Sequence, residues 1–141
     1  MFEKTTDVTR RLNQWRELRY NATSEQEVLE AFSQVKILPR YLDYWTPKDW
    51  PNPFEIIEHG YFCATGIAIL LYQTLGNLKY LNPSETTWKV ISNHVTGNDG
   101  AVFIHAEKVY NLTPGQTNNL DDLVANSITL KDFKNLYIPL I

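Results

Sequence analysis

The sequence predicts an α+β fold in which helices come first and a small antiparallel sheet follows. Apolar residues recur at helical spacing through the first quarter of the chain, whereas apolar and polar residues alternate in the second half. Between these regions, residues 63–75 are apolar on nearly every side, which is typical of a buried helix that ends at Gly76. We therefore expect N-terminal helices, a buried central helix that carries the cysteine, and strands packed against that helix.

Composition limits the class of protein. The chain has 141 residues, of which 43% are hydrophobic and 21% charged, so it suits one globular domain (1–141) with little disorder. The formal net charge is −3 and no long basic run occurs, which argues against a nucleic-acid partner. The opening residues lack the apolar stretch of a signal peptide, and the longest apolar run, residues 67–72, is too short to span a bilayer. These features predict a cytoplasmic protein with no membrane partner and leave the oligomeric state open.

Two helices are expected near the N-terminus. The first covers residues 8–19, with Thr6 or Asp7 as its N-cap. The second begins after Ser24, which with Glu27 has the form of a capping box. Both helices are interpreted as scaffold, because an apolar stripe is how a helix buries one face.

A segment rich in proline and aromatic residues follows, at residues 38–54. Four prolines exclude a long helix there. We expect an ordered loop that covers the core and buries Trp45 and Trp50, although such a loop could also line a substrate groove. Its aromatic residues are Tyr41, Tyr44, Trp45, Trp50 and Phe54.

The remaining elements are predicted from period and turn signals. A short helix is expected at residues 54–59, ended by Gly60. Strands are expected at 88–95, 101–106 and 109–112, with a turn at 97–100. A closing helix is predicted at 127–133, and the apolar tail at 137–141 should pack down on the core.

Cys63 is the most informative residue for chemistry. It lies at the first turn of the central helix, where free amides and the helix dipole favour a thiolate and therefore a nucleophile. The alternative is a small core residue, because free cysteine is often buried. With a single cysteine, no internal disulfide and no multi-cysteine zinc site can form, and we expect no cofactor and no metal.

A cysteine nucleophile needs a base, and the chain has three histidines. His59 is expected on the surface, and His94 ends the first strand just before the turn. His105 lies within the second strand, where a histidine is more often structural. Asn111, on the third strand, can orient an imidazole or can simply belong to a turn.

The order of these parts resembles the papain-like and transglutaminase-like superfamily of thiol enzymes. Residues 60–71, GYFCATGIAILL, are similar to the cysteine-bearing helix of the small papain-fold toxin families. Residues 109–115, VYNLTPG, are similar to their Val-Phe/Tyr-Asp-Asn…Pro-Gly segment, with Asn111 at the Asp position. The resemblance covers about residues 60–115, and both motifs are short.

The resemblance implies a cysteine-dependent peptidase, deamidase or acyl transferase acting on a protein or other amide-bearing substrate. It implies Cys63 as nucleophile, His94 as general base and Asn111 as the orienting group, with amides of residues 62–64 stabilising the oxyanion. In these families the histidine begins the second strand, which here falls near residues 98–100, and none of these is histidine. His94 is the residue that can reach this end of the sheet from across the hairpin.

Two further interpretations remain open. The chain can be a catalytically inactive papain-fold relative that binds a protein partner through the aromatic residues 41–50. It can also be a bacterial or phage accessory protein without enzyme relatives. The enzyme interpretation alone requires a reactive thiol that ionises more readily than a free one, and a dependence of that reactivity on His94 rather than His105.

Overall fold

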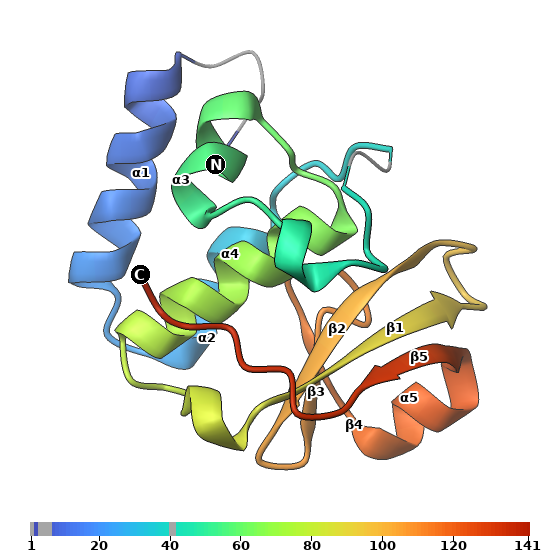
Figure 1. Ribbon diagram of the computed structural model, residues 1–141. Coiled ribbons are helices and arrows are strands. Elements are labelled where there is room, and N and C mark those ends of the chain that lie inside the picture. Colours follow the sequence, from blue (N-terminus) through green and yellow to red (C-terminus); the bar gives the residue numbers. More distant parts are fainter. Residues whose placement is uncertain (1, 3–6, 40–41) are drawn as a thin grey trace.

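The computed structural model describes residue 2, residues 7–39 and residues 42–141. Most of the helices precede the sheet and one lies between its last two strands, which confirms the predicted α+β class (Figure 1). The five strands follow the order β4-β3-β2-β1-β5, and all neighbouring strands are antiparallel. The elements are α1 (Val8–Asn21), α2 (Glu25–Ser33), η1 (Pro47–Asp49), α3 (Pro53–His59), α4 (Ala64–Asn77), η2 (Pro83–Glu85), β1 (Thr87–Asn93), β2 (Asp99–His105), β3 (Lys108–Tyr110), β4 (Thr117–Asn119), α5 (Leu120–Asn126) and β5 (Ser127–Phe133).

The first two helices begin where the sequence predicts. Asp7 caps α1 by accepting a hydrogen bond from the Thr9 amide, while the other candidate, Thr6, lies outside the described residues. Ser24 accepts from the Glu27 amide and caps α2. The Glu27 carboxylate bonds to the Thr23 amide rather than to Ser24, so the observed contacts make half of the predicted capping box.

Helix α1 buries a stripe that differs from the predicted one. Trp15 is buried and its indole donates to Thr74 of α4 at 2.9 Å. Arg11 is also buried, because its guanidinium donates to the Ile57 carbonyl at 2.9 Å near the C-terminus of α3. Val8, predicted to be apolar contact, is 38% exposed. The hydrogen bond from the guanidinium to a backbone carbonyl explains how the charged Arg11 can be buried in the core.

Helix α4 is the buried centre of the fold, as predicted. Every residue from Thr65 to Gly76 is buried, and the aromatic ring of Tyr72 packs on Trp88 of β1 and Phe103 of β2. The C-terminal tail runs along this helix (Figure 1). Gln73 donates to the Pro139 carbonyl at 2.9 Å, which confirms that the tail packs down on the core.

The far face of the sheet carries a second apolar cluster, covered by α5. The expected helix at 127–133 is wrong, because these residues form β5 and pair with β1 along its length. The helix lies one segment earlier, capped by the Asn119 side chain, which accepts from the Asp122 amide. The cluster comprises Ile91, Val102, Val109, Leu112 and Leu123.

The aromatic segment covers the core only in part. Trp50 is half-buried, and its ring centroid lies 5.3 Å from Trp88 and 6.4 Å from Phe133. Trp45 is 42% exposed, so the prediction that both rings are largely buried is wrong for Trp45. Tyr41 lies outside the described residues.

This difference between the two tryptophans gives a stability prediction. We expect Trp50→Ala to lower the free energy of unfolding by about 2–3 kcal/mol, because two aromatic contacts and buried area are lost. Trp45→Ala is the matched control and should cost less than about 1 kcal/mol. Urea unfolding of both variants measures the difference, and equal losses would contradict the assignment.

Candidate functional site

A pocket of about 550 Å³ opens at the N-terminus of α4. Three segments line it: the loop after α2, the first turn of α4, and the turn between β1 and β2. The lining residues are Ile37, Leu38, Pro39, Cys63, Ala64, Thr65, Gly97, Asn98 and Asp99. The cysteine identified from the sequence therefore lies in a cavity that a ligand can enter.

Cys63 is the N-cap residue of α4. Its Sγ accepts a hydrogen bond from the Gly66 amide at 3.4 Å, in the position where a serine or aspartate oxygen usually caps a helix. The residue is only 2% exposed, yet it lines the pocket. Cys63 is therefore a buried residue in the wall of the pocket.

The first turn of α4 lies directly against the start of β2. The Ala101 amide of β2 donates to Thr65 Oγ1 at 3.4 Å. A Cβ placed on Gly100 would lie 3.2 Å from the Ala64 Cβ, so backbone and helix approach closely here. This contact places Cys63 beside the start of β2. In the papain-fold families that the sequence resembles, the histidine begins this strand.

Asn111 fixes the same helix turn from the other side. Its Nδ2 donates to the Ala64 carbonyl at 2.8 Å and to the Ala101 carbonyl at 3.3 Å, and its Oδ1 accepts from the Gly115 amide at 3.0 Å. Both amide hydrogens are thus used on backbone carbonyls. The structure brings Cys63 and Asn111 to one helix turn, while the orientation of an imidazole by Asn111 stays a prediction.

The backbone at Asn111 also ends β3. Its φ of 76° is left-handed, so β3 stops at Tyr110, two residues before the predicted end. The Tyr110 hydroxyl donates to the Glu25 carboxylate of α2. Burial raises the pKa of Tyr110, and the hydrogen bond to Glu25 raises it further, because both favour the neutral hydroxyl over the phenolate. This bond holds β3, and with it the adjoining Asn111, against α2.

His94 is exposed and follows the last residue of β1. Its backbone amide donates to the Asn126 carbonyl at 2.8 Å, on the side of the turn that faces β5. It shares the turn with Gly97 and Asn98 but is not one of the residues that line the pocket. Among the described residues, no hydrogen bond or ion pair joins His94 to Cys63 or Asn111, so its role as a base stays a prediction.

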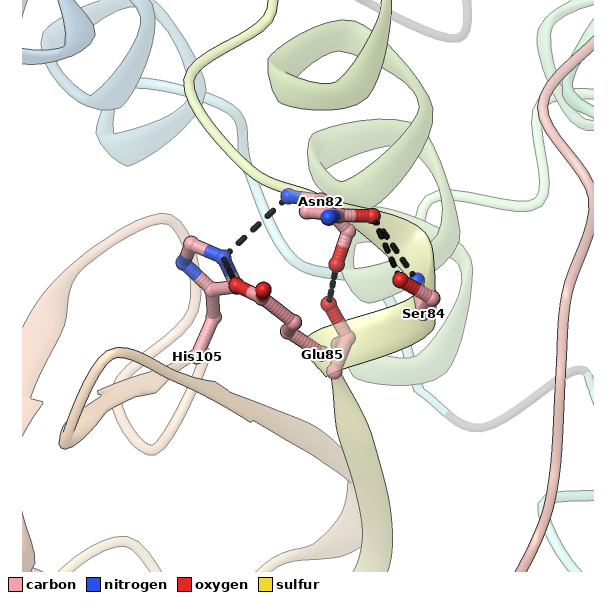
Figure 2. A network of polar contacts seen from close by, with 5 residues as sticks. Asn82, Ser84, Glu85 and His105 are labelled. Atoms are coloured by element: carbon pink, nitrogen blue, oxygen red, sulfur yellow. Dashed lines mark hydrogen bonds and ion pairs between the residues drawn. The ribbon is translucent and has the colours of Figure 1, made fainter.

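The other two histidines have different surroundings. His105 accepts a hydrogen bond from the Asn82 amide at 3.1 Å, with the Glu85 carboxylate 3.9 Å away (Figure 2). This contact ties the end of β2 to η2, the structural role that the sequence favours for a strand histidine. His59 is exposed, and its ring centroid lies 5.4 Å from that of Tyr61.

Asp99 is the site residue that sequence analysis missed. It is the first residue of β2 and lines the pocket, and its carboxylate accepts from the Tyr44 hydroxyl at 3.3 Å. Among the residues that line this pocket, only Cys63 and Asp99 have side chains that ionise. The sequence offered one indication of this role. Asp99 lies within residues 98–100, where the resemblance places the histidine of the catalytic set.

The amides expected to stabilise an oxyanion differ in their availability. The Phe62 amide donates to the Gly60 carbonyl at 2.8 Å and is therefore already used. Ala64 and Thr65 are the first two residues of α4, where backbone amides have no partner within the helix. Of the expected amides, that of Ala64 therefore has no partner within the helix, and a role in stabilising an oxyanion stays a prediction.

Within the described part of the chain, no group of three or more His, Cys, Asp or Glu side chains is placed to hold a metal ion. Among the same residues, no helix has the length and apolar character to cross a membrane.

A cysteine at the head of a buried helix, packed against an antiparallel sheet, defines a papain-like α+β fold. Two solved structures of LapG from Legionella pneumophila are similar to this chain, one of them calcium-bound. They have TM-scores of 0.68 and 0.67 at 14% and 15% identity. The likeness covers 93% and 94% of this chain and 78% of each LapG chain, and it shows the fold. No family model and no curated protein matches the sequence.

Proposed function

We propose that this chain is a thiol-dependent hydrolase of amide or acyl bonds, with Cys63 as its nucleophile. One observation supports this most: the single cysteine caps a buried helix at an open pocket, beside two helix amides without partners in the helix. The helix dipole at this end favours negative charge, both on a thiolate and on a developing oxyanion.

The reaction proceeds in two steps. Sγ of Cys63 attacks the carbonyl carbon of the substrate, the C–N bond breaks, and the amine leaves with the thiol proton. Water then attacks the thioester, which releases a carboxylic acid and restores the thiol. The amides of Ala64 and Thr65 bind the carbonyl oxygen when it carries charge.

His94 is the proposed base, since it lies in the turn that forms one wall of the pocket. It would take the thiol proton and pass it to the leaving amine. Asn111 holds the first turn of α4 against β2 and so keeps the sulfur and the helix amides in place.

The test uses an activated ester, p-nitrophenyl acetate, as acyl donor. Mass spectrometry should find one acetyl group on Cys63, and Cys63→Ala should abolish this adduct. Cys63→Ser tests whether the fold survives, because its hydroxyl can still accept from the Gly66 amide. Circular dichroism of both variants separates loss of chemistry from loss of structure.

The histidine role has its own prediction. We expect His94→Ala to slow acylation by about 10²–10⁴-fold, the usual contribution of a general base. His59→Ala, an exposed histidine outside the pocket lining, should leave the rate unchanged. Equal rates for both variants would remove His94 from the mechanism.

A second candidate is a binding module that uses the same pocket without catalysis. Two observations favour it. No imidazole is among the pocket-lining residues, and position 100, within the stretch where the resemblance places a histidine, is glycine. In that case a protein or amide-bearing ligand should protect Cys63 from iodoacetamide, yet no acyl adduct should form.

A further inference from the structure

We infer that the Cys63 pocket selects amide or acyl substrates that carry a positive charge, such as a lysine or arginine side chain, and that Asp99 binds this charge. The inference rests on the proposed function, because it names the substrate class of the same pocket.

The charge on one wall is negative. Asp99 lines the pocket and is exposed there, while its Oδ2 accepts from the Tyr44 hydroxyl at 3.3 Å. Tyr44 is itself buried, so this bond holds the carboxylate to a fixed part of the fold. Among the described residues, no lysine, arginine or histidine forms an ion pair with Asp99.

Another part of the pocket lining is apolar. It consists of Ile37, Leu38 and Pro39, of which the first two are half-buried. A lysine or arginine side chain has an apolar stem and a charged end, and it therefore matches both kinds of lining. A carboxylate would repel an anionic substrate, and a purely apolar one would leave Asp99 without a charged partner.

The Asp99 carboxylate also lies where it can affect the charge around the thiol. In a Cys–His pair, the imidazolium places a positive charge beside the thiolate. Here a carboxylate stands at the start of β2 and shares the pocket with Cys63. A substrate cation bound by Asp99 would bring positive charge into this pocket together with the carbonyl, so binding and charge compensation occur together.

Charged thiol reagents test the inference directly. A methanethiosulfonate transfers its thioalkyl group to Sγ, forming a disulfide and releasing methanesulfinate. The trimethylammonium-ethyl, methyl and sulfonatoethyl reagents carry positive, zero and negative charge. Each rate is divided by its rate with free N-acetylcysteine, which removes the intrinsic reactivity of the reagent.

We expect the normalised ratio of cationic to anionic rates to be roughly fivefold for the native chain, as for unit charges roughly 8 Å apart in water. In Asp99→Asn the ratio should fall close to one. Asp121→Asn is the control, because Asp121 is an exposed carboxylate on α5 outside the pocket. A ratio of one in the native chain, or the same fall in both variants, would overturn the inference.

A second measurement does not need the thiol. In Cys63→Ala, N-acetyl-lysinamide should shift the backbone amide signals of residues 97–99, whereas N-acetyl-norleucinamide should not. Lysine binding without any thiol reaction would contradict the nucleophile and support the cation site. Thiol reaction without charge preference and without lysine binding would contradict the cation site and leave the nucleophile standing.

Discussion

Gly66→Ala should lower the free energy of unfolding by about 3 kcal/mol or more, among the largest effects of a single methyl group in this fold. A Cβ at this position would lie 1.9 Å from the Tyr61 carbonyl oxygen and 3.1 Å from its carbon. These are backbone atoms, and the Tyr61 amide is bonded to the Ile56 carbonyl at the end of α3, so the peptide is held in place. Urea unfolding measures the loss.

Two other glycines serve as controls for this variant. At Gly76 the atoms nearest to the added methyl belong to the Leu140 side chain, which can move, so Gly76→Ala should cost less. At Gly97 there is open space but φ is +75°, so Gly97→Ala should cost about 1–2 kcal/mol from backbone strain alone. If Gly66→Ala were as stable as Gly76→Ala, the close approach of the Tyr61 carbonyl to α4 would be wrong.

Asn111→Ala should cost about 3 kcal/mol. The variant leaves the carbonyls of Ala64 and Ala101 and the Gly115 amide without their side-chain partner, and each lost bond is worth about 1 kcal/mol. It also puts alanine at a φ of 76°, which asparagine tolerates better. Thermal unfolding should show a clear decrease in the midpoint.

Asn135→Ala separates these two causes. Asn135 is also left-handed, with a φ of 62°, but it is exposed, so its variant pays the backbone cost alone. The excess loss in Asn111→Ala then measures the buried hydrogen bonds. Equal losses in the two variants would mean that the bonds to α4 and β2 do not stabilise the fold.

The sequence predicts the elements that have strong local signals. The apolar run after Cys63 identifies α4, and Gly60, with a φ of 69°, ends α3 as expected for a left-handed C-cap. The segment 120–133 lacks such signals. Helix α5 buries only Leu123, and β5 exposes Ile128 and Leu130, so neither has a clear apolar period.

A site residue could be predicted from the sequence only where its role depends on a single segment of the chain. Cys63 follows from its place at a helix start, which is a local property of the sequence. Asp99 enters the pocket because α4 packs on β2, and that contact joins parts of the chain that no local pattern connects. For the same reason, the sequence alone could not predict the three hydrogen bonds that join the Asn111 side chain to the backbone of Ala64, Ala101 and Gly115.

The strand order has a consequence for the sequence of folding events. Strands β1 to β4 follow one another as neighbours, so they can pair through short connections. The partner on the other side of β1 is β5, which arrives from the far end of the chain and closes the largest loop in the sheet. Until β5 docks, β1 is an unpaired edge with free amides and carbonyls. When refolding is slow, partly folded chains should therefore associate through the exposed edge of β1. The yield of refolded protein should be highest at low protein concentration.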